Sequence, residues 1–516
     1  MKRPQLIAPG SLNRILQAAE AAWLRKDFQE CIETLERASR LAPANAGIHL
    51  QLGRVYGLRY DYAAAERCFE RATRFAPRKT EMLKAVAKHS EDFRNPEITE
   101  RYLRQTVEQP DSAPETYIKL AELYERRRRL PEAAQLVERV LKLNPAYPAA
   151  LLVRARLERQ AGRLEEAEHV LRSFITKPNP DTWVQAQAWY ELGNILDRQN
   201  KFDDAMSAFL AAKALMQPQA ASHLAEVKIM RARLKVMEAN ISAGMLQRWF
   251  NESQALLPSR RMALLCGHPR SGTTLLEQVL DAHPDIVSVE EALVFMDEAF
   301  TPLKRNLPPD TYMLPVLETV SSPALLQARS AYFRAMELSI GNPIGSRLLL
   351  DKNPILTSLI PAFARIFPET KFLIALRDPR DVVLSCFMQP QPLNGVTATY
   401  LSLEGATEDY TAVMSIWRTL APLMPGPYLE VRYEDMIDDL ESVAQKTLDF
   451  LGVPWDPRVL GFDEHARQKM VRSPTYADVT QPVYKRAMGR WRNYQKYLEP
   501  HLEKLAPFAK AFGYVA

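Results

Sequence analysis

Residues of the same type recur along the first half of the chain with a period of about 34 residues. Prolines that follow an apolar, helix-like stretch lie at spacings of 34, 33, 35 and 33 residues, namely Pro43, Pro77, Pro110, Pro145 and Pro178. The positions between these prolines also recur, with small and large apolar residues at fixed offsets. A period of this length is typical of repeat proteins in which each unit packs against the next. The pattern predicts about six repeats over residues 10–218.

The recurring residues resemble the tetratricopeptide repeat, which carries Trp-x2-Leu-Gly-x2-Tyr, then Ala-x3-Phe and a closing proline. One unit of this chain carries Leu52, Gly53, Tyr56, Ala65, Phe69, Ala72 and Pro77 in that order. The resemblance implies an α-solenoid in which Gly53 and Ala65 lie where the two helices of a unit cross. Tyr56 and Phe69 would fill the seam to the next unit, and Pro77 would end the second helix.

The same resemblance implies a concave groove that holds a peptide or a partner protein. Residues of the first helices would line it, including Arg54, Glu122, Arg156, Arg159, Asn194 and Asp197. These side chains have mixed charge, so they identify no ligand. A spacer or a dimerisation surface, and with it a homodimer, stays an alternative.

Beyond the repeats, the pattern changes to short β-type runs separated by amphipathic helical stretches. The runs are Met262–Cys266, Ile286–Val289, Leu348–Leu350, Lys371–Leu376 and Tyr428–Val431, and the helical stretches include Thr274–Ala282, Leu356–Ile366, Arg380–Met388 and Asp435–Leu451. This alternation predicts a mostly parallel sheet covered by helices on both faces. We expect a helical connection over residues 219–255 and a three-layer α/β domain over residues 256–516.

Charged residues follow each of the five predicted strands. These residues are Arg270 after the first strand, Glu290-Glu291 after the second, Asp351-Lys352 after the third, Arg377-Asp378-Pro379-Arg380-Asp381 after the fourth and Glu434 after the fifth. Ligands of open parallel sheets bind at the carboxyl ends of the strands. Cations and carboxylates gathered there predict an anion site with a base beside it.

The loop after the first strand reads Gly-x4-Gly-x-Thr, from Gly267 to Thr274. Between a strand and a helix, such a loop places backbone N–H groups around an anion at the helix N-terminus. A Walker A loop would carry a lysine at the position of Thr273, and here the cation is Arg270 instead. Without that lysine a P-loop kinase or NTPase is the less favoured alternative. A non-enzymatic repeat scaffold is a further alternative.

Two segments together resemble the sulfotransferase superfamily, whose members use 3′-phosphoadenosine-5′-phosphosulfate (PAPS). The 5′-phosphosulfate loop would comprise Pro269, Arg270, Ser271, Gly272, Thr273 and Thr274. The segment from Phe372 to Ser385 resembles the 3′-phosphate motif, in which Arg377 and Ser385 would bind the phosphate that ATP lacks. The resemblance covers roughly residues 260–500 and implies a P-loop-like sulfotransferase domain that needs no metal.

The late segment Lys485–Trp491 resembles the loop that covers the cofactor in this superfamily. The resemblance implies that Arg486 and Gly489 contact the nucleotide. A solvated basic helix is the alternative interpretation.

A narrower resemblance is to tyrosyl-protein sulfotransferases. It implies that Glu291 is the general base, that Lys352 contacts the sulfuryl group, that Tyr433 lies near the nucleotide and that Ser473 donates a hydroxyl. Ala292-Leu293 stand where that family has Thr-Arg. The acceptor is therefore open between tyrosine of a peptide or protein, a sugar and a small molecule. Glu290 and His268 stay as alternative bases.

Composition sets the broad class of protein. The net charge of +5 over 516 residues predicts neither nucleic-acid nor membrane binding. No uninterrupted apolar stretch of about 18 residues occurs, and the N-terminus lacks an apolar signal core. Four cysteines without paired spacing, Cys31, Cys68, Cys266 and Cys386, indicate neither a disulfide framework nor a zinc site. We therefore expect a cytoplasmic, metal-free enzyme.

Overall fold

The structure, a computed structural model, describes residues 9–177, 179, 181–256, 258–305, 307–308, 311–468 and 485–514. Pro178 and Ser473, which carry predictions from the sequence, lie outside the described residues. The described chain divides into two compact units, Met1–Pro145 with Phe333–Pro343, and Ala146–Tyr332 with Ile344–Ala516. The expected boundaries at residues 218 and 255 stay predictions.

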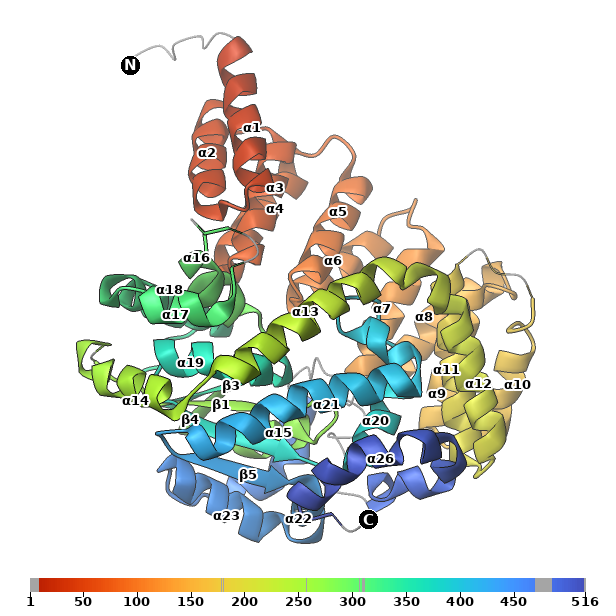
Figure 1. The fold of residues 1–516 in the computed structure, drawn as a ribbon. Helices are drawn as coiled ribbons and strands as arrows, with labels where there is room; N and C mark the ends of the chain where they lie inside the picture. The colour runs from red at the N-terminus through yellow and green to blue at the C-terminus, as the bar shows by residue number, and fades with distance from the viewer. Residues whose placement is uncertain are drawn as a thin grey trace. The chain divides into compact units, whose positions relative to one another are not determined.

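The first unit contains helices that pair in succession along the chain (Figure 1). They are α1 (Pro9–Leu24), α2 (Phe28–Leu41), α3 (Ala46–Leu58), α4 (Tyr62–Phe75), α5 (Lys79–Asp92), α6 (Pro96–Val107), α7 (Pro114–Arg126) and α8 (Leu130–Leu143). Asp27, Asn45, Asp61 and Asn95 begin four of them, because each side chain accepts a hydrogen bond from a backbone N–H of the first turn. The predicted α-helical repeats are confirmed.

Close packing explains the small and large residues of the repeat. A Cβ atom at position 53 would overlap the ring of Phe69, so only glycine lets α3 approach α4 this closely. Phe69 is fully buried and its ring lies near those of Phe93 and Tyr102 in the next unit, as predicted. Tyr56 is half-buried and donates a hydrogen bond of 2.6 Å to Glu36 of the preceding unit.

The second unit begins with four further helices of the solenoid. These are α9 (Pro148–Gln160), α10 (Leu164–Arg172), α11 (Thr182–Arg198) and α12 (Phe202–Met216). Two more helices, α13 (Ala221–Asn240) and α14 (Ala243–Asn251), then lead to the sheet. The last repeats and the α/β domain therefore belong to one compact unit.

The sheet has five parallel strands in the order β2-β3-β1-β4-β5. The strands are β1 (Met262–Gly267), β2 (Ile286–Glu290), β3 (Leu348–Lys352), β4 (Lys371–Leu376) and β5 (Tyr428–Arg432), within two residues of every predicted run. In the register, Glu290 is opposite Lys352 and Leu265 is opposite Lys352 on the other side. All carboxyl ends therefore lie at one edge of the sheet.

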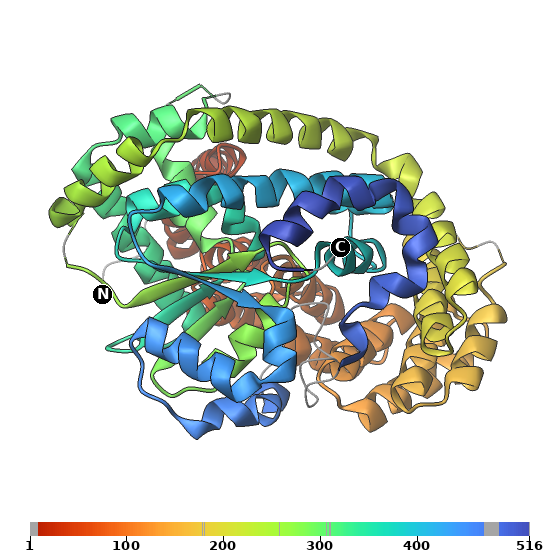
Figure 2. The ribbon, with the colours of Figure 1, turned by 60° about the horizontal axis from the view of Figure 1, so that its bottom comes forward.

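Helices cover both faces of this sheet, as Figure 2 shows. One face packs its apolar side chains against α15 (Thr273–Asp281), α22 (Tyr433–Asp438), α23 (Leu440–Leu451) and α24 (Phe462–Gln468). Near the other face lie α19 (Ile360–Ile366), α20 (Pro379–Phe387) and α21 (Leu403–Leu420). There the ring of Phe363 meets Phe372 and that of Trp417 meets Tyr428. The predicted three-layer α/β fold is confirmed.

Two predicted helices differ in detail from the structure. The stretch predicted over Asp435–Leu451 is two helices, because the carboxylate of Asp439 accepts a hydrogen bond from the N–H of Ser442 and begins α23. The stretch Leu356–Ile366 begins as a 3-10 turn, Pro354–Leu359. The described residues of this region also form α16 (Thr301–Leu303), α17 (Met313–Thr319), α18 (Ser322–Ile340) and α26 (Gln495–Ala511). None of the described helices combines the length and apolar character needed to cross a bilayer.

Candidate functional site

The loop between β1 and α15 is buried and tightly folded. Gly272 has a φ of 93°, and a Cβ atom there would lie 2.7 Å from the ring of Tyr433, so glycine is required. Ser271, Thr273 and Thr274 are all buried beside it. The loop therefore presents the first N–H groups of α15 at the edge where the strands end, which is an arrangement that binds anions.

Three predicted residues from distant parts of the sequence meet at this loop. Arg270 adopts a positive φ of 73° and donates from Nε to Ser385 Oγ at 3.1 Å. Arg377 donates from Nη1 to the carbonyl oxygen of Arg270 at 3.2 Å, and its guanidinium carbon lies 4.9 Å from the ring centroid of Tyr433. Two cations and a hydroxyl therefore converge at the ends of β1 and β4. Their roles in binding stay predictions.

The late segment predicted to cover the cofactor lies against this group. We call residues 485–494 the covering segment; it contains two 3-10 turns, Lys485–Ala487 and Arg490–Tyr494. Arg377 Nη2 donates to the carbonyl oxygen of Ala487 at 2.5 Å. Gly489, a predicted nucleotide contact, is held here by its backbone, whereas Arg486 is exposed.

Asp381 anchors the covering segment through two backbone N–H groups. Its carboxylate accepts hydrogen bonds of 2.7 Å from Gly489 and 2.8 Å from Trp491. Burial raises the pKa of Asp381, although Arg377 and these N–H groups act in the opposite direction. Nearby, Arg380 pairs with Asp378 at 2.8 Å and lies 4.0 Å from the ring centroid of Trp491. The Asp378–Arg380 pair is therefore a structural support of the covering segment.

Lys352, the last residue of β3, lies among three carboxylates. Its Nζ is 2.6 Å from Glu291 Oε1, 3.4 Å from Glu290 Oε1 and 3.9 Å from Glu277 Oε2. Burial alone would lower the pKa of Lys352, but the three carboxylates outweigh it and raise that pKa above its ordinary value. Lys352 therefore keeps its charge in a fully buried position.

Glu291 differs from the other two carboxylates in exposure and backbone. Its side chain is 34% exposed, against 4% for Glu290 and 0% for Glu277. Its φ is 48°, a conformation that L-residues rarely adopt, and its N–H donates to the carbonyl oxygen of Lys352 at 2.8 Å. Strained backbone of this kind is concentrated at functional sites. Of the three carboxylates around Lys352, Glu291 is therefore the one most exposed to solvent.

The residues beside Lys352 support the site from behind. Asp351 points to the opposite face of the sheet, where it accepts a hydrogen bond of 2.8 Å from the hydroxyl of Tyr332. Burial raises the pKa of Asp351 to about 7. Asn353 donates from Nδ2 to the carbonyl oxygen of Ala292 at 2.9 Å and so fixes the turn after Glu291.

His268 does not reach the surface of the site, so it is not an alternative base. It is fully buried, with Nδ1 2.9 Å from the carbonyl oxygen of Pro269 and Nε2 3.2 Å from Asp409 Oδ2. Burial alone would lower its pKa, but Asp409 and Cys386 raise the pKa of His268 to about 10. The ring is therefore an imidazolium that donates from both nitrogens and supports the loop.

The sequence did not identify Glu277 or Thr357 as parts of the site, and it placed Asp381 after a strand without indicating that it anchors the covering segment. Glu277 stands inside the apolar run of α15, and a carboxylate buried on the sheet side of a helix is a usable signal. Thr357 accepts a hydrogen bond of 2.8 Å from the N–H of Gly267 at the start of the loop. Its place in a 3-10 turn carries no comparable signal in the sequence.

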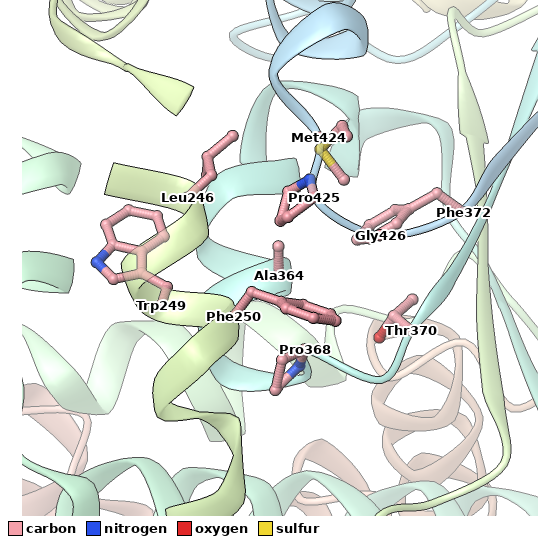
Figure 3. Close-up of a pocket in the computed structure, with 10 residues that line it drawn as sticks. All are labelled: Leu246, Trp249, Phe250, Ala364, Pro368, Thr370, Phe372, Met424, Pro425 and Gly426. Atoms are coloured by element: carbon pink, nitrogen blue, oxygen red, sulfur yellow. The ribbon is translucent and has the colours of Figure 1, made fainter. Parts of the chain in front are cut away.

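A small apolar cavity lies away from these strand ends (Figure 3). It is lined by Leu246, Trp249, Phe250, Ala364, Pro368, Thr370, Phe372, Met424, Pro425 and Gly426. Thr370 and Gly426 precede β4 and β5, so the cavity belongs to the amino-terminal edge of the sheet. None of these residues is charged, and the charged groups described above lie at the other edge.

Among the described residues, no group of three or more His, Cys, Asp or Glu side chains is arranged to hold a metal ion.

The chain is similar in sequence to several known proteins. It is 25% identical over 260 residues to protein-tyrosine sulfotransferase A of Caenorhabditis elegans, an alignment that covers 48% of this chain and 66% of that protein. The protein-tyrosine sulfotransferase of Drosophila melanogaster is 28% identical over 251 residues, with 45% and 48% covered. An uncharacterised protein of Aquifex aeolicus is 24% identical over 391 residues, with 73% and 48% covered. The chain thus spans about half to two thirds of the length of these relatives.

The chain is also similar to a solved structure and matches two models of protein families. The sulfotransferase domain of the Synechococcus PCC 7002 olefin synthase is 22% identical, with 49% of this chain and 96% of that domain covered and a TM-score of 0.33. Residues 263–457 match the model of the sulfotransferase family. Residues 100–181 and 184–221 match the tetratricopeptide repeat. The chain therefore combines tetratricopeptide repeats with a domain of the sulfotransferase family.

Proposed function

We propose that the chain transfers a sulfuryl group from PAPS to an acceptor hydroxyl, with tyrosine of a peptide or protein as the first acceptor class to test. The observation that carries the proposal is the convergence of Arg270, Arg377 and Ser385 at the loop without a Walker lysine. This convergence is what a nucleotide with a phosphate at the 3′ position needs, since a phosphate is bound best by paired cations and hydroxyl donors.

The residues present fit such a nucleotide. The loop from Pro269 to Thr274 offers N–H groups at a helix start for the 5′ side. Arg377 is buried and its Nε has no hydrogen-bond partner among the described residues, so it has donor capacity to spare for a 3′-phosphate. Ser385, also buried, supplies a hydroxyl beside it. Tyr433 packs against the loop and against Arg377 and so keeps both in place.

The residues around Lys352 suit the transfer step. PAPS supplies an activated sulfuryl group, and transfer of such a group depends on positioning and on stabilisation of charge. Lys352 keeps its proton on Nζ and holds Oε1 of Glu291 at 2.6 Å, which orients that carboxylate. Glu291 can then accept the proton of an acceptor hydroxyl on its other oxygen, Oε2. General-base catalysis of this kind contributes typically about 10² to 10⁴ in rate.

The repeats would hold a peptide or protein acceptor, and a homodimer is compatible with the same surface. The four dispersed cysteines, all free in the structure, support a reducing, cytoplasmic setting.

Leu293 is exposed and follows the glutamates at a position where tyrosyl-protein sulfotransferases have a cation. This difference supports an acceptor with an apolar group near the hydroxyl over a strongly acidic peptide.

A calorimetric titration of the full chain tests the nucleotide assignment. We expect PAPS and its desulfated product, adenosine 3′,5′-bisphosphate (PAP), to bind much more tightly than ATP. Tighter binding of ATP, or ATP turnover without PAP binding, would contradict the proposal and favour a P-loop kinase or NTPase. Absence of binding by all three nucleotides would favour the non-enzymatic scaffold.

A further inference from the structure

The last tetratricopeptide repeat, α11 with α12, touches the covering segment directly. Asp197 on α11 is 16% exposed, and its Oδ2 lies 2.8 Å from Nη2 of Arg490. Its Oδ1 accepts hydrogen bonds of 2.7 Å from the hydroxyl of Tyr494 and 3.2 Å from Nε of Arg490. Tyr494 is fully buried and meets the ring of Phe202 on α12 edge-on at 5.6 Å. Asp197 was predicted to line an open groove, but its carboxylate bonds instead to residues of the chain's own C-terminal region.

These contacts place the covering segment between two carboxylates. The carboxylate of Asp381 accepts hydrogen bonds from the N–H groups of Gly489 and Trp491 at one end. Asp197, on the repeat, holds the side chains of Arg490 and Tyr494. A short stretch of 3-10 turns has little internal stability of its own, so such anchors decide how long it stays closed.

The same repeat also reaches the phosphosulfate loop from behind. Lys213 on α12 is buried and donates to the carbonyl oxygen of Tyr400 at 2.5 Å. The hydroxyl of Tyr400 donates to Asp409 at 3.1 Å, and Asp409 binds His268, which donates to the carbonyl oxygen of Pro269. Hydrogen bonds at the backbone and at the side chain of Tyr400 therefore connect α12 to Pro269 of the loop.

We propose that the last repeat is a structural part of the nucleotide site and that Asp197 is a positioning residue that keeps the covering segment closed. The inference rests on the proposed PAPS function and assigns to this repeat a role other than acceptor recruitment. Within the part of the chain that the structure describes, the side chain of Asp197 bonds to none of the residues predicted to contact the nucleotide. It acts through Arg490 and Tyr494, which are continuous with the part of the segment that Arg377 and Asp381 hold.

The expected effect follows from the fraction of molecules with a closed segment. Apparent nucleotide affinity falls in proportion to that fraction. Asp197→Ala removes one partly buried ion pair and the hydrogen bond from Tyr494, interactions with a charged group that are among the stronger ones in proteins. We expect PAP to bind about tenfold more weakly. Arg490→Ala removes the same ion pair from the segment side, leaves α11 intact and is expected to weaken PAP binding in the same direction.

Asp203→Ala is the matched control. Asp203 lies in the first turn of α12 and pairs with Lys496 and Tyr497 on α26, just after the covering segment. Its side chain is 66% exposed, and exposed ion pairs contribute little. This variant should bind PAP within about twofold of the unchanged protein. Asp197→Glu, which keeps the charge, should recover part of the affinity that Asp197→Ala loses.

The experiment measures PAP affinity by calorimetry and hydrogen exchange of residues 487–494 in the full chain. Supporting results are weaker PAP binding and faster exchange of this segment in Asp197→Ala and Arg490→Ala, while α11 and α12 exchange at unchanged rates. The double variant should bind PAP no more weakly than Asp197→Ala alone, since Arg490→Ala removes an ion pair that Asp197→Ala has already removed. PAP affinity and segment exchange equal to the unchanged protein in both single variants would overturn the inference, as would an equal loss in Asp203→Ala. Failure of the unchanged protein to bind PAP would instead contradict the proposed function.

Discussion

Replacement of Lys213 by methionine should change how stability depends on pH. The Nζ atom lies 2.5 Å from the carbonyl oxygen of Tyr400, 5.0 Å from the ring centroid of Tyr190 and 4.8 Å from that of Phe387. No carboxylate of a described residue pairs with it. Burial therefore lowers the pKa of Lys213 from its ordinary 10.5 to about 7. A methionine side chain at this position would fill much of the same space without an ionisable group.

The magnitude follows from the two protonation states. Between pH 7 and 10.5 the unfolded chain binds more protons at Lys213 than the folded chain, so this group makes stability rise with pH by about 1.4 kcal/mol per unit. His268 acts in the opposite sense. Its pKa is raised from 6.5 to about 10, so the folded chain binds more protons there and stability falls with pH over that window. In the unchanged protein the two slopes nearly cancel between pH 7 and 10.

Differential scanning calorimetry at pH 7.5 and 9.0 tests this balance. With Lys213→Met the slope from His268 is left unopposed, and stability should fall by about 2 kcal/mol more than in the unchanged protein over this range. At about 2 °C per kcal/mol, the midpoint should fall by about 4 °C more. His268→Gln should show the opposite slope. A Lys213→Met variant with the pH dependence of the unchanged protein would refute the reasoning, because Lys213 would then not be a neutralised buried amine.

Two further predictions concern the site itself. Glu291→Gln should leave the affinity for PAP within a few-fold of that of the unchanged protein and lower the turnover of PAPS by about 10² or more. Replacement of the buried Glu290 by glutamine should lower turnover much less. The reverse order of the two variants in steady-state kinetics would make Glu290 the base. Arg377→Ala should weaken the binding of PAPS by about 10- to 100-fold. It should weaken the binding of adenosine 5′-phosphosulfate, which has no 3′-phosphate, far less. Equal losses of affinity for the two ligands in a calorimetric titration would refute a contact of Arg377 with the 3′-phosphate.

Local signals in the sequence were sufficient for the sheet and its loops. Short apolar runs bounded by charged residues identify all five strands within two residues, because buried parallel strands need continuous apolar sequence. Parallel strands also place their carboxyl ends together, which predicts that Arg270 and Arg377 lie close to each other, and the resemblance to the 3′-phosphate motif adds Ser385. Helix ends are set by single capping side chains, which the apolar pattern does not reveal. Asp439, an internal cap, divides a stretch that reads as one amphipathic helix.

Contacts over long sequence separations could not be predicted in the same way. Asp197 looks like any exposed acid of a repeat, and only tertiary packing reveals that Arg490 and Tyr494 occupy it. Lys213 follows two alanines in an amphipathic helix, and nothing nearby in the sequence indicates its contact with Tyr400, 187 residues later. His268 shows the converse. Its place in the loop made it an alternative base, but its partner Asp409, 141 residues away, holds it as a buried support of the loop.

Sulfuryl transfer by the full chain is the most direct test of the account. The protein is incubated with PAPS and a tyrosine-containing peptide or a simple phenol, and PAP formation is followed by anion-exchange chromatography, with ATP in parallel. The account predicts PAP and a sulfated acceptor in equal amounts, dependent on Glu291, with ATP unchanged. Hydrolysis of ATP or phosphorylation of the acceptor, with PAPS left intact, would contradict it.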